Sequence, residues 1–207
     1  MAIKTSRLGA LALSLVACFT STFGLTFMSS FAFAQPETGQ YTIDAAHSGV
    51  TFAADHMGYT QVQGRFNEFS GSFTVDVKGK VNLQVDIVAA SIDTNLSKRD
   101  DHLRSPDFFN VKQFPEIRFS SSVVLEAELS ENKIQTIEGE LSLLGVTRPI
   151  TLTLTKGKEA QDPWGYHRIG YRATSVVKRS DFGMEFMLGG LGDEITVVIT
   201  IEAIKAK

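Results

Sequence analysis

KVNLQVDIVA, residues 80–89, decides the fold, because its apolar and polar side chains alternate along the segment. One side carries only Val, Leu, Ile and Ala, and the other carries Asn82, Gln84 and Asp86. Successive side chains of a strand point to opposite faces, so the alternation predicts a strand with one buried and one solvated face. That pattern is typical of antiparallel sheet.

The same alternation recurs along the rest of the chain. Including residues 80–89, about eight segments read as strands, and the others are residues 41–55, 69–77, 117–129, 137–143, 150–155, 164–177 and 195–202. Eight strands with one apolar face each can close on themselves and leave no exposed edge. We therefore expect an all-β, antiparallel eight-stranded barrel. Its interior would be either filled by side chains or able to hold one small ligand, and composition does not decide between the two.

The segment DDHLRSPDFFNVKQFP, residues 100–115, breaks the alternation. Helical character is expected over residues 96–103, and Ser105-Pro106-Asp107 resembles a second helix start, with Ser as N-cap and Pro at the first position. The sequence thus predicts one or two short helices. We expect Asp100, Asp101 and Arg104 to lie on the solvated side of the first helix. Phe108, Phe109 and Phe114 are expected to press the segment onto the barrel as a plug or lid.

Residues 1–34 have the features of a secretory signal peptide. Lys4 and Arg7 give a basic start, an uncharged run follows, and Ala32-Phe33-Ala34 has the small-x-small pattern of a cleavage site. We expect cleavage after Ala34, one domain over residues 35–207, and no stable membrane insertion of the cleaved protein. A retained anchor, or lipidation of Cys18, is the alternative.

Several function classes find little support in the chain. Removing Lys4 and Arg7 leaves 18 basic and 23 acidic residues, a formal charge of 18 − 23 = −5, which disfavours nucleic acid as a partner. The four histidines show no close ligand pair, so no metal site is expected. Asp44, His47 and Ser48 are adjacent, but we expect them to form a local turn and not a catalytic triad.

Six motifs together resemble one known family. They are YTIDAAHSGVTF from Tyr41 to Phe52, GRF from Gly64, FSG from Phe69, HLRSPDFFNVKQFP from His102, GELSLLGVTRP from Gly139, and DFGM from Asp181. In this order they resemble the YceI-like family of exported bacterial lipid-binding proteins, over about residues 41–204. The resemblance implies a periplasmic, lipocalin-like barrel whose apolar cavity holds a polyisoprenoid or a similar long-chain amphiphile. It implies no catalytic residue.

We therefore expect a periplasmic carrier for a long-chain isoprenoid lipid, of the quinone or prenyl phosphate type, with no further cofactor and no catalytic activity. Face alternation and the predicted lid give the expected ligand-binding residues: Phe52, Phe66, Phe73, Leu83, Val85, Ile87, Phe108, Phe109, Phe119 and Leu143. One alternative is an enzyme acting on a lipid or its head group, with His47, Asp101 and His102 as the acid–base set. Another is a stress-response, partner-binding protein with a filled core. Homodimerisation through an outer face stays open.

Overall fold

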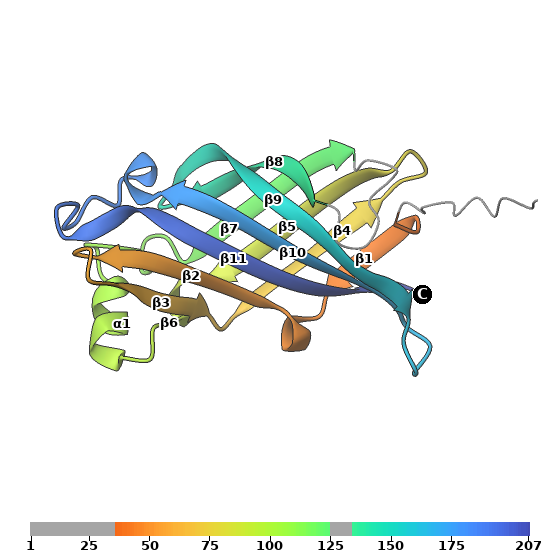
Figure 1. Ribbon diagram of the computed structural model, residues 1–207, viewed down its shortest axis with the longest axis horizontal. Coiled ribbons are helices and arrows are strands. Elements are labelled where there is room, and N and C mark those ends of the chain that lie inside the picture. Colours follow the sequence, from red (N-terminus) through yellow and green to blue (C-terminus); the bar gives the residue numbers. More distant parts are fainter. Residues whose placement is uncertain (1–35, 125–133) are drawn as a thin grey trace, which may run out of the picture. The chain divides into compact units, whose positions relative to one another are not determined.

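Eight antiparallel strands form a closed ring in the computed structural model, which describes residues 36–124 and 134–207 (Figure 1). In order around the ring they are β1 (Gly39–Ile43), β4 (Phe69–Val75), β5 (Lys80–Val88), β7 (Glu116–Val124), β8 (Ile134–Leu143), β9 (Val146–Gln161), β10 (His167–Lys178) and β11 (Leu191–Lys205). Pairing of β1 with β11, for example Ile43 with Ala203, closes the ring. The expected eight-stranded antiparallel barrel is confirmed. The expected signal peptide, its cleavage site and Cys18 lie outside the described residues.

Three further strands extend the wall beside β11. β2 (Gly49–His56) pairs with the first part of β11, β3 (Thr60–Phe66) pairs with β2, and the short β6 (Ile92–Asp93) pairs with β3. The expected single segment 41–55 is therefore two strands, β1 and β2. They are separated by a 3-10 turn, η1 (Ala45–His47), which Asp44 caps by accepting a hydrogen bond from the backbone N–H of Ala46.

The segment of residues 80–89 behaves as its alternation predicts. On β5, Val81, Val85 and Ile87 are buried, while Asn82 and Gln84 are exposed. The buried face points into the barrel, and the same arrangement repeats on the other strands of the ring. The core of the protein is therefore the lining of the barrel.

The segment before β7 contains one α-helix, α1 (Ser97–Leu103), as expected for its first half. The second expected helix does not form: Ser105 Oγ accepts from the N–H of Asp107, but the chain continues as turns up to β7. The expectation for Asp100 is wrong, because its side chain is buried and accepts hydrogen bonds from the N–H and hydroxyl of Thr94. Thr94 precedes α1, so this pair ties the helix to the barrel wall.

The end of the barrel away from α1 holds polar side chains. Lys156 and Tyr171 are cross-strand partners, and Lys156 forms a buried ion pair of 2.7 Å with Glu159. His167 Nε2 lies 3.0 Å from Glu159. Tyr41 stacks on Phe73 next to this group, with 4.7 Å between ring centroids. Aromatic rings and an ion pair therefore close this end of the interior.

Within the described part of the chain, we find no helix with the length and apolar character needed to cross a bilayer.

Candidate ligand-binding cavity

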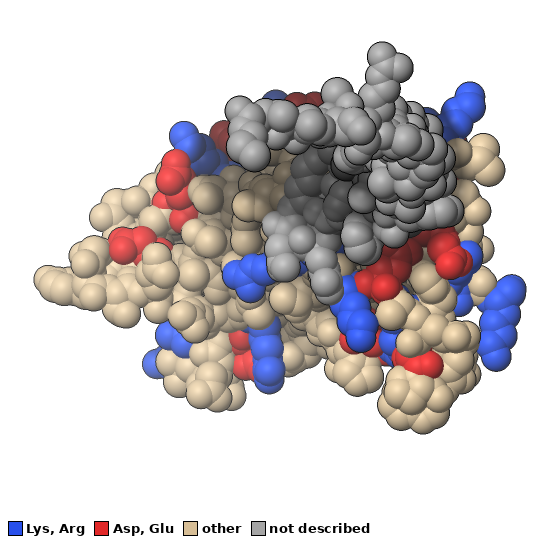
Figure 2. Space-filling model, turned by 45° about the vertical axis from the view of Figure 1, so that its right-hand side comes forward, with Lys and Arg blue, Asp and Glu red and all other residues tan. Residues whose placement is uncertain are grey.

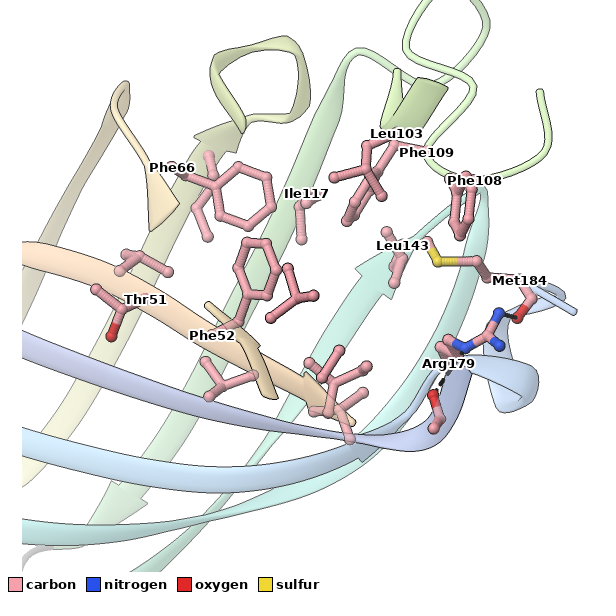
Figure 3. A pocket seen from close by; sticks show the side chains of 18 of the residues that line it. Thr51, Phe52, Phe66, Leu103, Phe108, Phe109, Ile117, Leu143, Arg179 and Met184 are labelled. Atoms are coloured by element: carbon pink, nitrogen blue, oxygen red, sulfur yellow. Dashed lines mark hydrogen bonds between the residues drawn. The ribbon is translucent and has the colours of Figure 1, made fainter. Parts of the chain in front are cut away.

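A cavity of about 570 Å³ occupies the part of the barrel next to α1 (Figure 3). Its wall comes from the inner faces of the ring strands, from β2 and β3, from α1 and from the loop between β10 and β11. The interior of the barrel is thus not filled by side chains. Eight of the ten residues predicted to contact a ligand line this cavity: Phe52, Phe66, Val85, Ile87, Phe108, Phe109, Phe119 and Leu143.

The other two predicted residues, Phe73 and Leu83, line a smaller inner cavity of about 80 Å³ farther from α1. Both cavities have four wall residues in common: Val85, Phe119, Leu152 and Ile199. We call the two spaces the outer and the inner chamber. Ligand contact by these ten residues stays a prediction, but the structure places all ten on chamber walls.

Two glycines make room for aromatic rings against the wall. A Cβ at Gly64 would lie 2.3 Å from Cζ of Phe52, and one at Gly139 would lie 2.3 Å from Cζ of Phe119. Real side chains cannot approach so closely, so each ring occupies the space that a side chain would take. The rings of Phe52 and Phe119 are thereby kept close to the sheet, which leaves the outer chamber open.

Aromatic side chains cover the chamber on the α1 side. Phe109 meets Phe66 edge to face, with 5.7 Å between ring centroids. Phe108 lies between His102 of α1 and Phe186 of the β10–β11 loop, at 5.0 and 5.3 Å. The turn after α1 therefore contributes to the roof of the chamber, in agreement with the predicted plug or lid.

Arg179 is the most deeply buried charged side chain of the chamber wall, and the sequence analysis did not identify it. It is only 3% exposed and donates hydrogen bonds to the backbone carbonyls of Met184, Phe186, Leu191 and Gly192. Burial lowers the pKa of Arg179, and the charge of Asp193 opposes this. Arg179 thus holds the β10–β11 loop in its conformation (Figure 3). In the sequence, the alternation of β10 stops after residue 178, and this is the only signal for the loop.

The acid–base set considered from sequence is not brought together. The first residue of β2, Gly49, pairs with Thr200 of β11, and the last residue of β2, His56, pairs with Leu191. The two ends of β2 therefore lie at opposite ends of the paired part of β11. His47 lies just before the Gly49 end, whereas His102 contacts Phe186, which shortly precedes Leu191. About nine strand residues, or about 30 Å, separate these positions. The arrangement gives no support to joint catalysis by His47 and His102.

His47 forms the expected local turn. Its Nδ1 lies 2.9 Å from Asp44, and the Ser48 hydroxyl accepts from the N–H of Glu202. Asp44, His47 and Glu202 together could offer three ligand atoms to a cation. However, Arg168 donates to both carboxylates, and the hydrogen bonds from His47 and Arg168 lower the pKa of Asp44. Arg168 therefore already offsets part of the negative charge that a cation would meet, and it also pairs with Asp162.

Charged side chains of both signs are interspersed over the face seen in Figure 2. The described residues visible in that view form no continuous basic surface of the kind that binds a phosphate backbone.

Comparison with known proteins connects the barrel to one family. The family model described as YceI-like domain matches residues 41–203. Protein YceI of Escherichia coli is 36% identical over 194 residues, which cover 90% of this chain and 98% of that protein. A UPF0312 protein of Photorhabdus laumondii is 38% identical over 173 residues, covering 81% and 87%.

Solved structures share the fold. The YCEI protein of Campylobacter jejuni is 29% identical with a TM-score of 0.65, and the match covers 74% of this chain and 90% of that one. Burkholderia cenocepacia BcnA matches at 23% identity and a TM-score of 0.67, covering 77% and 98%. A polyisoprenoid binding domain from Saccharophagus degradans matches at 18% identity and a TM-score of 0.65, covering 82% and 100%.

Proposed function

The chain belongs to the YceI-like family, and from this premise we propose that it is a periplasmic carrier that holds a long-chain isoprenoid lipid in the two chambers of its barrel. The lipid would be of the quinone or prenyl phosphate type. The protein would take it up and release it without changing it chemically.

The outer chamber is the observation that carries the proposal. Its volume of about 570 Å³ lies in the range of small-molecule sites, and its wall is mostly aliphatic and aromatic. Each CH₂ group moved from water into such a space contributes about 0.8 kcal/mol. A prenyl chain of a few units would therefore bind well with few polar contacts, and chain length and shape would govern selectivity.

The polar residues of the wall support one orientation of the lipid. Arg99, His102 and Arg179 lie along the α1 side of the outer chamber. The inner chamber, by contrast, is lined by aliphatic and aromatic side chains with Ser121 as an exception, and the Ser121 hydroxyl donates to the carbonyl of Glu138. We place the prenyl chain toward the inner chamber and the head group toward α1.

Mass spectrometry of an organic extract tests the proposal. Protein purified from its native host without detergent is extracted, and the expected result is a prenyl-chain lipid in near-stoichiometric amount. The unfolded protein, carried through the same purification, is the control for adsorbed lipid. Extracts that never contain a prenyl lipid would overturn the proposal, and a lipid altered by incubation with the protein would favour the enzyme alternative.

Export belongs to the same proposal and has its own test. The mass of the protein from the periplasmic fraction is expected to match residues 35–207, that is, cleavage after Ala34. A full-length mass in the cytoplasmic fraction would contradict export, and a lipid-modified mass beginning at Cys18 would indicate a lipoprotein.

A further inference from the structure

Apolar side chains are exposed around the mouth of the outer chamber. Five of them come from two turns, the β2–β3 turn and the β10–β11 loop, and their exposed fractions are 52% for Met57, 85% for Tyr59, 36% for Phe186, 47% for Met187 and 41% for Leu188. We call these five residues the apolar rim. Single exposed apolar residues are ordinary, but a group of this size marks a contact surface.

The two turns of the rim are held together. The N–H of Met57 donates to the carbonyl of Gly190, and the N–H of Gly190 donates to the carbonyl of Met187. A Cβ on Gly190 would lie within 3.4 Å of the methyl groups of both methionines, so the two side chains converge over this glycine. In Figure 1 the two turns lie side by side at the α1 end of the barrel.

Both methionines also have an unusual backbone conformation. Met57 has φ 55° and Met187 has φ 53°, in the left-handed region that Gly and Asn adopt most readily. A large apolar residue at such a position costs backbone strain and, when exposed, also costs hydration. Both turns thus combine backbone strain with an exposed apolar side chain, and they do so at the same place. The stability of the folded protein alone does not account for this combination.

The rim is continuous with the chamber. Phe186 and Met187 belong to the rim and also line the outer chamber, together with His56 and Thr60 at the ends of the β2–β3 turn. Met57, Tyr59 and Leu188 lie outside the lining. A lipid that leaves the chamber at this mouth therefore passes directly from the chamber wall onto the rim.

We propose that the apolar rim inserts into the surface of a phospholipid bilayer, so that the cargo moves between membrane and chamber without crossing water. This inference rests on the proposed function for its purpose, because a water-insoluble lipid must be collected from a membrane. A bilayer fits the rim better than a protein partner does, since protruding Met, Phe, Leu and Tyr side chains enter the interfacial region without needing a complementary shape.

The charges near the rim indicate which bilayer it fits. Residues 57–60 and 186–192 contain no charged side chain, and the residues that border them include Asp55, Glu185 and Asp193. These acidic neighbours offer no attraction to anionic lipids. We therefore expect insertion into zwitterionic phosphatidylcholine, with little dependence on salt.

Fluorescence quenching by brominated lipids locates the inserted end. The only tryptophan, Trp164, lies 77% exposed in the β9–β10 turn, at the other end of the barrel (Figure 1). In the double variant Trp164→Phe and Tyr59→Trp, the new indole should be quenched about two-fold by vesicles of brominated phosphatidylcholine, as expected for burial at acyl-chain depth. Trp164 of the unaltered protein should not be quenched. Quenching at both ends, or at neither, would overturn the proposal.

Transfer kinetics test the role of insertion. The double variant Met57→Asn and Leu188→Asn removes apolar surface outside the chamber lining, and Asn suits the left-handed conformation of Met57. Lipid transfer to phosphatidylcholine vesicles should slow about ten-fold, the loss expected for two partly exposed apolar side chains. The matched control, Val77→Asn with Trp164→Asn, alters two exposed apolar residues of the opposite end and should transfer at the original rate.

The outcomes separate this inference from the proposed function. Quenching does not require a bound lipid. Insertion of the empty protein would therefore support membrane insertion of the apolar rim even if no prenyl lipid were ever extracted. Lipid found in the chamber, together with equal transfer rates in both double variants, would overturn membrane insertion of the apolar rim. The proposed carrier function would be unaffected. Sedimentation that shows a dimer lost in the rim variant, without vesicle binding, would assign the rim to a second copy and overturn the proposal.

Discussion

At the scale of single residues, glycines matter because of the side chains that rest on them. Phe52 and Gly64 are cross-strand partners on β2 and β3, and the phenyl ring of Phe52 lies over the bare Cα of Gly64. A ring that takes the place of a side chain at Gly64 adds apolar wall and fills less of the lumen. The width of the outer chamber therefore depends on a residue that has no side chain.

Gly64→Ala should narrow the outer chamber. The new Cβ would lie 2.3 Å from the Phe52 ring and 2.8 Å from the Thr94 methyl group, so the ring must turn into the lumen. We expect a weaker affinity for a fluorescent long-chain lipid and a loss of about 1–3 kcal/mol in the free energy of unfolding, as in other overpacked sites. Titration of the lipid and urea denaturation measure the two effects.

Two further variants make this result specific. Gly64→Ala combined with Phe52→Leu should recover affinity, because the smaller side chain leaves room for the methyl group. Gly49→Ala is the matched control on β2, where the nearest atom, Oγ1 of Thr200, would lie at an ordinary 3.4 Å. Equal loss in both alanine variants would show that the effect comes from the backbone and not from the ring.

At the scale of elements, α1 and the turn after it form a cover whose two sides differ in chemistry. Asp100 attaches the helix to Thr94 by two hydrogen bonds, and Phe108 and Phe109 of the turn line the chamber. Arg104 donates to the carbonyls of Ala90 and Ile92, next to β6. The helix is therefore anchored by hydrogen bonds, while the turn that roofs the chamber is held by aromatic packing.

Phe109→Ala should speed lipid uptake and release, because it removes the ring that packs on Phe66 over the chamber. Stopped-flow fluorescence with a polyene fatty acid measures both rates. Phe114→Ala is the matched control, since Phe114 lies in the same segment, packs near Gly145 and does not line the chamber. Rates that change equally in both variants would show that the turn packs against the barrel without controlling lipid uptake and release.

The polar end of β9 and β10 predicts an acid sensitivity. Burial alone would raise the pKa of Glu159, but hydrogen bonds from Lys156, His167 and the N–H of Glu37 outweigh it and leave the pKa below its usual 4.5. The unfolded chain therefore binds more protons than the folded one below about pH 4.5. The contribution of Glu159 to stability is complete above this pH and is lost as the pH falls toward the lowered value.

Glu159→Gln should accordingly flatten the decline of the melting temperature below pH 4.5 while lowering stability at pH 7. Glu194→Gln, at an exposed position of β11, is the control and should leave the profile unchanged. A profile for Glu159→Gln that parallels the unaltered protein would show that other carboxylates dominate acid unfolding.

How much could be predicted from the sequence differs between kinds of element. Alternation on β5 and its neighbours was enough for the barrel, because a side-chain period of two fixes which face is buried. Together with the predicted lid, it gave ten residues that all lie on chamber walls. The Asp44 turn that divides β1 from β2 was expected locally, but its effect on strand pairing was not. The burial of Asp100 depends on its hydrogen bonds to Thr94, and the role of Arg179 depends on carbonyls of the β10–β11 loop and the start of β11. Alternation of apolar and polar residues does not reveal either set of contacts.

At the scale of the whole molecule, the two chambers lie in series along the barrel, and Val85 belongs to both walls. The division into chambers was not predictable, since alternation gives the face on which a side chain lies but not the shape of the space inside. A long chain must pass the residues that the chambers share before it reaches the inner one. Under the proposed function, chain length would therefore govern which lipids bind.

Val85→Phe should shift the preference toward shorter prenyl chains by narrowing the passage between the chambers. Competition among prenols of increasing length, followed by mass spectrometry of the bound fraction, measures the shift. Val62→Phe adds the same volume at the outer chamber alone, and it should weaken all lengths by a similar factor. An unchanged length preference in Val85→Phe would show that bound chains do not extend into the inner chamber.

Ring closure by β1 and β11 has a kinetic consequence. The pairing of Ile43 with Ala203 joins segments from opposite ends of the folded sequence, so it is among the last contacts that the chain can make as it is synthesised. Such distant pairings fold slowly, on the scale of milliseconds to seconds. During that interval the apolar lining faces outward. Assembly of the barrel and first loading with lipid would then be coupled events, with cargo acting as a template for closure.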